Sequence, residues 1–275
     1  DQTGSGATIG VKQNGTSNDS DVTQSASLAS VTVDQDGTDN ESDVSQVAGG
    51  STIDVEQDGI ENVSDVTGIA NGSDVTVTQD GTSNESLVTQ NEALLRVRLP
   101  FVGNVNLPVN ENQSATVFQD GDDNFSSVAQ YGRNQVASVT QIGNGNNSGI
   151  DDPAGPVGIV QVGENQIANL LQEGDGNSSF IEQGTNGNFL VLTGASSDGN
   201  LATVNQTGND GQSTVDQNGD DNDVLLNQDG VDNISIITQA GNGNSATVGQ
   251  GGIGDSSDIT QSGNGHIAIV SQNQP

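Results

Sequence analysis

The chain has no cysteine, methionine or tryptophan among its 275 residues, and aromatic residues make up 2% of it. The absence of cysteine excludes a disulfide framework and thiolate metal sites. Hydrophobic residues account for 29%, and few of them are large, so an ordinary globular core would be thin. Low hydrophobicity with a net charge of -33 is also typical of disordered chains, so only regularity in the sequence can argue for order.

Positive charge is scarce as well, because four Lys and Arg stand against 37 Asp and Glu. Nucleic acid is not expected as a partner, since so few cations could not neutralise its phosphates. No apolar run approaches the roughly 18 residues that a membrane span needs, so we expect no membrane insertion. No signal peptide is visible, although a mature secreted chain would have lost it.

What the chain does contain is glutamine at intervals of 11 residues. Counting along this ladder gives 23 slots, of which 21 are Gln and two are Gly68 and Gly194. Five further Gln lie outside the ladder. Random composition does not produce such spacing, which argues against disorder as the final state, and internal repeats of this kind indicate a stacked architecture.

Each unit has a fixed internal pattern. Counted from Gln as zero, Gly lies at +2, Asn at +5, a small residue at +7, an aliphatic residue at +9 and the next Gln at +11. The unit from Gln35 shows it with Asn40, Ser42, Val44 and Gln46. Positions two apart share one face of a strand, and the acidic and hydroxyl residues between them suit a solvated face. Residues +1 to +4 are typical of a tight turn.

The units also alternate. The complete Gln-x-Gly-x-x-Asn pattern begins at ten Gln, and nine of these fall in the same alternate class, with Gln228 the exception. The true period is therefore 22 residues, which we interpret as strand, turn, strand, turn. One such unit cannot bury its apolar face alone, but stacked copies can. We predict one all-β domain over residues 1–275, a β-solenoid of two facing, parallel, in-register sheets with about 11 rungs, roughly 50 Å long.

Stacking places identical side chains directly above one another, so inward amides can hydrogen-bond along the stack. An isolated buried amide would be costly, whereas a ladder satisfies its donors and acceptors together. The predicted structural ladder consists of Gln13, Asn18, Gln24, Gln35, Asn40, Gln46, Gln57, Asn62, Gln79, Asn84, Gln119, Asn124, Gln130, Gln141, Gln172, Asn177, Gln217, Asn222, Gln228, Asn233, Gln239, Asn244, Gln261 and Gln272. Glycines that supply the backbone angles of the corners are predicted at Gly15, Gly37, Gly59, Gly81, Gly121, Gly219 and Gly230.

The spacing Gln-x-Gly-x-x-Asn-x-(Ser/Ala)-x-(aliphatic)-x-Gln closely resembles the curlin repeat, and the resemblance covers nearly the whole chain. It implies a secreted subunit with a two-sheet β-solenoid fold. Such subunits assemble end to end into extracellular curli-like amyloid fibres of bacterial biofilms, usually with a dedicated secretion pore and a nucleating partner. The chain departs from the best-known members in having about twice as many rungs, more acidic residues and insertions.

The largest insertion lies in the turn at about residues 91–110. Its apolar residues alternate with two arginines, which is typical of a strand. It either packs on the flank of the solenoid or forms a lateral contact between fibres or with a partner. The candidate contact residues are Leu95, Arg96, Val97, Arg98, Leu99 and Phe101.

Two smaller irregularities follow. Nine extra residues between Gln141 and Gln161 predict a polar surface loop in the turn at about 144–154. One extra residue between Gly194 and Gln206 predicts a bulge or a wider corner.

Acidic turns are the main candidate for ligand chemistry, because stacked carboxylates could bind Ca²⁺. Their positions vary between rungs, which favours a solvated anionic face instead. No cofactor is expected. His266, the single histidine, occupies an Asn slot, and no residues are spaced as a catalytic site.

The leading hypothesis is therefore a structural subunit of an extracellular curli-like fibre whose partner is another copy of itself. A nucleator subunit and a secretion pore are candidate further partners. The alternative is a monomeric acidic β-solenoid that binds Ca²⁺, ice or a cell-surface ligand. An enzyme is not expected.

Overall fold

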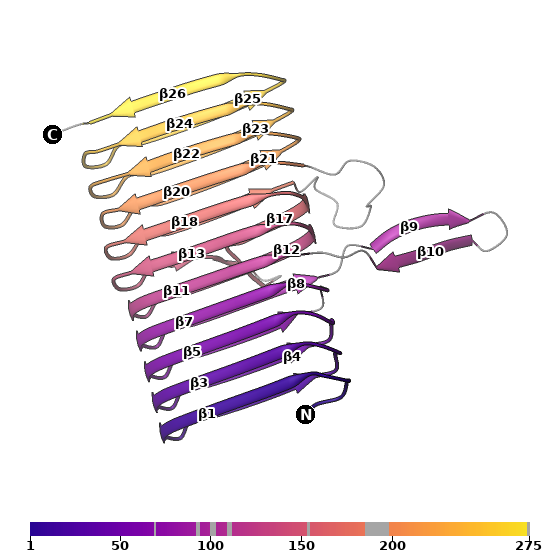
Figure 1. Ribbon diagram of the computed structural model, residues 1–275. Coiled ribbons are helices and arrows are strands. Elements are labelled where there is room, and N and C mark those ends of the chain that lie inside the picture. Colours follow the sequence, from indigo (N-terminus) through magenta and orange to yellow (C-terminus); the bar gives the residue numbers. More distant parts are fainter. Residues whose placement is uncertain are drawn as a thin grey trace.

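The computed structural model describes residues 1–68, 70–91, 94–99, 103–108, 112–152, 155–184 and 198–273. In 94–99, 103–108, 150–152 and 155–157 it describes the backbone alone. All regular elements within these ranges are strands, and most of them belong to two sheets of 11 strands each. The strands lie across the long axis as successive rungs, from β1 at one end to β26 at the other (Figure 1).

The first sheet, called sheet 1 below, contains one strand from every rung. In spatial order these are β1 (Thr8–Thr16), β3 (Ser30–Thr38), β5 (Thr52–Ile60), β7 (Asp74–Thr82), β11 (Ser114–Asp122), β13 (Val136–Ile142), β18 (Ile167–Glu173), β20 (Leu201–Thr207), β22 (Asp223–Gln228), β24 (Ser245–Gln250) and β26 (Ile267–Gln272).

Sheet 2 faces it and is built from the alternate strands. These are β2 (Asp19–Gln24), β4 (Glu41–Gln46), β6 (Val63–Gly68), β8 (Glu85–Asn91), β12 (Phe125–Arg133), β14 (Asn147–Ser148), β17 (Ile159–Glu164), β19 (Ser178–Gln183), β21 (Gln212–Asn218), β23 (Ile234–Ala240) and β25 (Ser256–Ser262).

Neighbouring strands in both sheets are parallel, and equivalent repeat positions pair. Gln35 pairs with Gln57 in sheet 1, and Val44 pairs with Val66 in sheet 2. The predicted fold class, a β-solenoid of two in-register parallel sheets, is confirmed.

The core lies between the sheets and is narrow. Its apolar residues are mostly Val and Ala, with a few Ile and Leu, and Val33, Val55 and Val77 are fully buried. Serine occupies the small-residue position of sheet 2, as in Ser42 and Ser64, which are also buried. Small side chains on both inner faces let the sheets pack closely, so a chain with few large hydrophobic residues still has a continuous core.

The first insertion leaves the solenoid between β8 and β11. It contains an antiparallel hairpin of β9 (Leu94–Leu99) and β10 (Gly103–Pro108), which projects away from the stacked sheets (Figure 1). The rungs on either side pair directly, with Gln79 beside Gln119. The side chains of Leu95, Arg96, Val97, Arg98 and Leu99, and all of Phe101, lie outside what the structure describes. Their lateral contact remains a prediction.

The second insertion differs from the prediction, because it interrupts a strand instead of a turn. The corner glycine Gly143 and the buried Asn146 keep the regular form, and β14 and β17 together fill one rung between β12 and β19. The excursion is a hairpin of β15 (Ile150–Asp152) and β16 (Gly155–Val157). A Cβ on Gly158 would lie 1.8 Å from Ser148 O, so the chain leaves and re-enters the strand at a point where glycine is required.

A third insertion was not predicted. Gln172 stacks directly on Gln206, and Gln183 on Gln217, across 34 residues instead of 22. The ladder therefore has no slot for Gly194, which lies outside the described residues, and the predicted single-residue bulge was wrong. The added length equals one further unit plus one residue, so spacing alone concealed it.

After this insertion the complete repeat pattern is no longer confined to one corner. Before it, the pattern begins at the end of sheet 1 strands, as at Gln172 in β18. After it, the pattern begins in both sheets, at Gln228 in β22 of sheet 1 and at Gln217 and Gln239 in sheet 2. The inferred single alternate class of units was therefore wrong.

Candidate functional site

The glutamines form two columns inside the solenoid, one toward the end of each sheet's strands; the column of sheet 1 is continuous, and that of sheet 2 is interrupted at one rung. In sheet 1 every Gln Nε2 donates to the Oε1 of the Gln on the next rung, from Gln13 to Gln272, at 2.7 to 3.0 Å. The same bond links Gln90 to Gln130 and later members in sheet 2. All these donors point toward the rung that is later in the sequence, so each column has a direction.

The direction of the amides is fixed by the backbone. Gln57 Nε2 also donates to Glu41 O at 2.9 Å and to Asn62 O at 3.0 Å. Gln79 Nε2 likewise donates to Val63 O at 2.9 Å. A backbone carbonyl can only accept, so turning the amide over would place oxygen against oxygen.

One rung of sheet 2 lacks a glutamine. Gly68 takes its slot and pairs in register with Gln46 and Gln90, which breaks the side-chain column there. A Cβ on Gly68 would lie 3.3 Å from Ile53 Cδ1, so the larger Ile53 occupies the space beside the missing amide. The sequence places Gly68 in a ladder slot that Gln fills elsewhere, and Gly68 takes that slot in the structure.

Asparagines form a second kind of column at the corners. Asn40 Nδ2 donates to Asp36 O at 3.1 Å and to Gly59 O of the next rung at 3.2 Å. Its Oδ1 accepts the backbone N–H of Asn62 at 3.0 Å. One buried side chain therefore closes its own turn and ties it to the following turn, which satisfies backbone groups that the corner would otherwise leave unpaired.

The corner glycines are required for two reasons. Gly121 has φ of 127°, a region that other residues rarely adopt. A Cβ on it would also lie 2.0 Å from Gly143 O, the corner carbonyl of the next rung. Every predicted corner glycine has a positive φ: Gly15, Gly37, Gly59, Gly81, Gly121, Gly219 and Gly230.

The columns contain members beyond the predicted set. Their 11-residue spacing was a sufficient signal for Gln2, Gln90, Gln161, Gln183, Gln206 and Gln250, and the repeat pattern marks Asn146. Three Gln outside the 11-residue ladder also join in, because they occupy the Asn slot of one corner: Gln113, Gln135 and Gln166.

Comparison with known families agrees with this geometry. The family described as the curlin associated repeat matches residues 29–59, 111–143 and 219–252. The protein is a curlin-repeat protein. Its repeats identify it in general as a curli-like structural subunit, from a family of fibre subunits and not of enzymes. No curated protein matches the chain.

In the curlin-repeat protein, titratable residues occupy the last two Asn slots, at the β25–β26 end of the stack. The backbone N–H of His266 donates to Asn244 Oδ1 at 3.0 Å, as an asparagine there would. Asp255 does the same with Asn233 Oδ1 at 2.9 Å. Asp255 Oδ2 is buried and has no hydrogen-bond partner among the described residues. Both residues belong to the corner columns, and the predicted ladder place of His266 agrees with its position.

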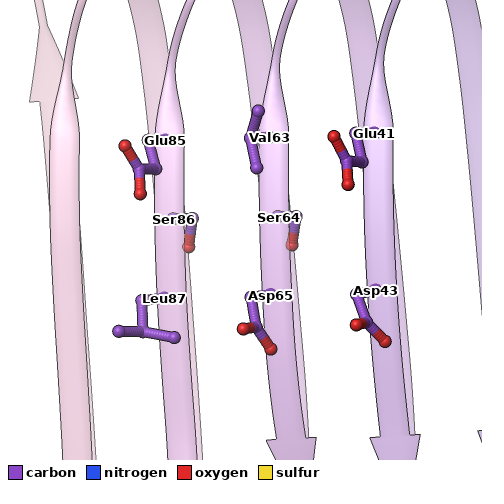
Figure 2. A pocket seen from close by; sticks show the side chains of 8 residues that line it. All are labelled: Glu41, Asp43, Val63, Ser64, Asp65, Glu85, Ser86 and Leu87. Carbon is purple, nitrogen blue, oxygen red and sulfur yellow. The ribbon is translucent and has the colours of Figure 1, made fainter. Parts of the chain in front are cut away.

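Carboxylates stack on the outer face of sheet 2. Asp43 and Asp65 are register partners on adjacent rungs, and Val63 lies between Glu41 and Glu85 in a parallel row (Figure 2). The small Val63 leaves a shallow hollow between the two longer side chains. Burial raises the pKa of the Asp65 carboxyl, and the charge of Asp43 raises it further.

A second carboxylate pair lies farther along the same face. Burial raises the pKa of Glu182 and of its register partner Asp216, and the charge of Asp216 adds to the shift of Glu182. No group of three or more His, Asp or Glu side chains that could hold a metal ion occurs in the described residues. Binding of Ca²⁺ by the acidic turns therefore stays an untested alternative.

Cations on the described surface pair along the stack. Lys12 Nζ lies 2.8 Å from Asp34 Oδ2 on the next rung, and Arg133 pairs with Glu164. The described part of the chain has no helix that is long and apolar enough to cross a membrane.

Proposed function

We propose that the curlin-repeat protein is the structural subunit of an extracellular curli-like amyloid fibre, which serves the biofilm matrix and surface adhesion. Its partner is another copy of itself, and its chemistry is assembly and not catalysis. The membership in the curlin family supports this proposal. A nucleator subunit and a secretion pore are proposed as further partners on the same ground, with no cofactor, nucleic acid or membrane-inserted segment.

The observation that carries the proposal is the pair of open strand edges at each end of the stack. β1 and β26 are the outer strands of sheet 1, and β2 and β25 are the outer strands of sheet 2. The first residues of the chain cover only the end of β2, where the amino group of Asp1 donates to Val22 O and Gln2 bridges to Gln24. Unpaired edges of this length template the addition of further strands, which monomeric proteins normally prevent.

The two ends are different surfaces, so a contact between them is heterologous. Joining the β25–β26 end of one copy to the β1–β2 end of the next leaves another open end. Such a contact does not close into a ring when successive subunits lie along one axis, and it produces a filament. Each junction would add one rung-to-rung contact of the kind found inside the subunit.

The test is assembly of the purified chain at neutral pH, followed by negative-stain electron microscopy and X-ray fibre diffraction. We expect unbranched fibres with a reflection near 4.8 Å along the fibre axis. Persistent monomers over days at high concentration and high salt would overturn the proposal. Stoichiometric binding of Ca²⁺ by such monomers, measured by calorimetry, would instead favour a monomeric acidic binding module.

A further inference from the structure

The amide columns stop at the outermost rungs with unlike groups unsatisfied. At the β26 end, Gln272 Nε2 donates to Ser256 O at 2.9 Å and has a second N–H that no described residue accepts. Gln261 Nε2 donates to Ser245 O at 3.0 Å, and its second N–H likewise has no acceptor among the described residues. This end, called the donor face below, therefore presents two amide N–H groups along the axis.

The opposite end presents acceptors. Gln13 Nε2 is directed inward and donates to Gln35 Oε1 at 2.7 Å, while Gln2 Nε2 donates to Gln24 Oε1 at 3.1 Å. No donor from a described residue reaches the Oε1 of either Gln13 or Gln2. This end, called the acceptor face below, carries two carbonyl oxygens where the donor face carries two N–H groups.

We propose that these four amides form a donor–acceptor code that makes the fibre polar and sets its register. Gln272 donates to Gln13 of the arriving copy, and Gln261 donates to Gln2. Two donor faces would bring N–H against N–H, and two acceptor faces would bring oxygen against oxygen, so like faces do not join. The inference rests on the proposed function, since it assigns the partner and orientation at its junction.

The order in which the two sheets alternate along the chain also fits this pairing. Gln261 belongs to sheet 2 and Gln272 to sheet 1, while Gln2 bridges to a sheet 2 strand and Gln13 belongs to sheet 1. The alternation of sheets therefore continues across the junction without a skipped slot. A copy rotated by half a turn about the axis would place each Gln over the wrong sheet and leave a gap.

The apolar positions match in the same register. Ala268 and Val270 on the donor face, and Ile9 on the acceptor face, are partly buried against the core. Val11 is 46% exposed. Pairing Gln272 with Gln13 places Val270 over Val11 and Ala268 over Ile9, so the junction continues the core as well as the amide columns.

A charge-matched pair of variants tests the code. Gln272→Glu replaces the outward donor by a carboxylate oxygen, which would face Gln13 Oε1. Gln13→Glu adds the same charge, and each variant loses one internal hydrogen bond, to Ser256 O for Gln272 and to Gln35 Oε1 for Gln13. Gln13→Glu, however, keeps an oxygen that can accept from Gln272. We expect seeded elongation to slow about tenfold or more for Gln272→Glu and to change by less than about twofold for Gln13→Glu.

Wild-type fibres set the reference for both variants, and thermal unfolding of the monomers checks that each variant folds. Equal slowing by the two variants, or stronger slowing by Gln13→Glu, would overturn the code. Failure of the wild-type chain to form fibres would overturn the proposed function instead, so the two failures are distinguishable.

Blocked faces test polarity independently of the amides. Val270→Asp places a carboxylate in the donor face and Val11→Asp places one in the acceptor face. Val11 is exposed and Val270 is partly exposed in the monomer, so each carboxylate keeps contact with water there and would lose it, unpaired, in a junction. We expect each variant alone to remain monomeric by light scattering, and their mixture to form dimers with a single junction. Dimers of either variant alone would show that like faces join and would overturn the inference.

Discussion

At the residue scale, the buried amides show how a polar side chain can belong to a core. Gln119 is fully buried, accepts from Gln79 Nε2, and donates to Gln141 Oε1 and to two backbone carbonyls, those of Glu85 and Asn124. Every polar group of the side chain is used. A ladder of this kind specifies register, because a slip by one residue would place each amide in solvent and each carboxylate in the core.

Replacing one ladder glutamine by a hydrocarbon of similar size should be strongly destabilising. Gln119→Leu would leave Gln141 Oε1 buried without its donor, and would remove one hydrogen bond each from Gln79 Nε2, Glu85 O and Asn124 O. A buried group left without a partner costs about 1–3 kcal/mol and each further lost hydrogen bond about 0.5–1.5 kcal/mol, so we expect the free energy of unfolding of the monomer to fall by about 3 kcal/mol or more. Denaturant unfolding measures it. Thr116→Val, on the exposed face of the same strand, is the control and should change stability little; equal effects would contradict the role of the ladder.

Substitution of a corner glycine should also lower the stability of the monomer. In Gly121→Ala, the added methyl would lie 2.0 Å from Gly143 O, and the backbone would keep an unfavourable φ of 127°. We expect a loss of about 3 kcal/mol or more in the free energy of unfolding. A Cβ on Gly249 in β24 would have no other atom within 4 Å, so Gly249→Ala should be neutral or slightly stabilising. A tolerated Gly121→Ala would contradict the close stacking of the corners.

At the element scale, the strands and their inward residues follow from the sequence because two periods coincide. A period of two selects a strand face, and a period of 11 returns the chain to the same face after each turn. Residues such as Asn40, Ser42 and Val44 could therefore be placed inside from sequence. The insertion at Gln183–Gln206 could not, because its length is close to a multiple of the repeat. The hairpin between Ser148 and Ile159 was also misplaced, since spacing counts inserted residues without locating them.

The direction of the amide columns was likewise beyond sequence reasoning. Either orientation of a glutamine amide fits a column of glutamines, and the choice depends on backbone carbonyls of the facing strand. Asp19 O and Asn40 O, which accept from Gln35 Nε2, make that choice in one rung. Repeat spacing predicts that such a ladder exists, whereas its polarity requires the structure.

Deletion of the hairpin β9–β10 tests what an element outside the solenoid contributes to stability, elongation and bundling. Gln79 and Gln119, 40 residues apart, are already hydrogen-bonded to each other beneath it. Removing residues 94–108 and joining the ends with a short glycine linker should therefore leave the unfolding temperature and the elongation rate nearly unchanged. We expect fibre bundling, counted by electron microscopy, to decrease. Unchanged bundling would contradict the predicted lateral contact, and loss of folding would show that the hairpin stabilises the rungs.

Stacked carboxylates give sheet 2 a defined pH dependence. Because the pKa of Asp65 is raised in the folded chain, the folded state binds its proton more tightly than the unfolded state. The stability from this group is fully present below its unfolded pKa, about 3.9, and is lost as pH rises through the folded value. Glu182 and Asp216 act in the same direction. We expect the unfolding temperature of the monomer to rise as pH is lowered from 7 toward 4.

The variant Asp65→Asn isolates one group. It should be more stable than the wild type at pH 7, and the difference should shrink as pH falls, because the wild-type carboxyl then becomes neutral as well. Asp54→Asn is the matched control, since Asp54 pairs with Thr32 and Thr76 instead of another carboxylate. Thermal unfolding at several pH values measures both. A difference at Asp65 that grows toward low pH would contradict the interpretation.

At the scale of the whole molecule, short-range attraction and long-range repulsion oppose each other. The donor and acceptor faces attract through hydrogen bonds and apolar contact within a few ångströms. The net charge of -33 repels an approaching copy over the much longer distance of the electrostatic screening length. This balance would keep subunits apart in dilute solution while leaving a formed junction stable, because the repulsion acts mainly on the approach.

Salt should therefore accelerate assembly. The screening length falls from about 30 Å at 0.01 M to about 3 Å at 1 M ionic strength, so the repulsion between copies decreases while the contacts within a junction change little. We expect the seeded elongation rate, followed by dye fluorescence, to rise several-fold from about 0.01 M to about 0.5 M NaCl. An equal osmolarity of sucrose is the control for effects of water activity. A rate that is independent of NaCl, or that falls with it, would show that charge repulsion between copies does not limit growth, and the acidic outer faces would then need another explanation.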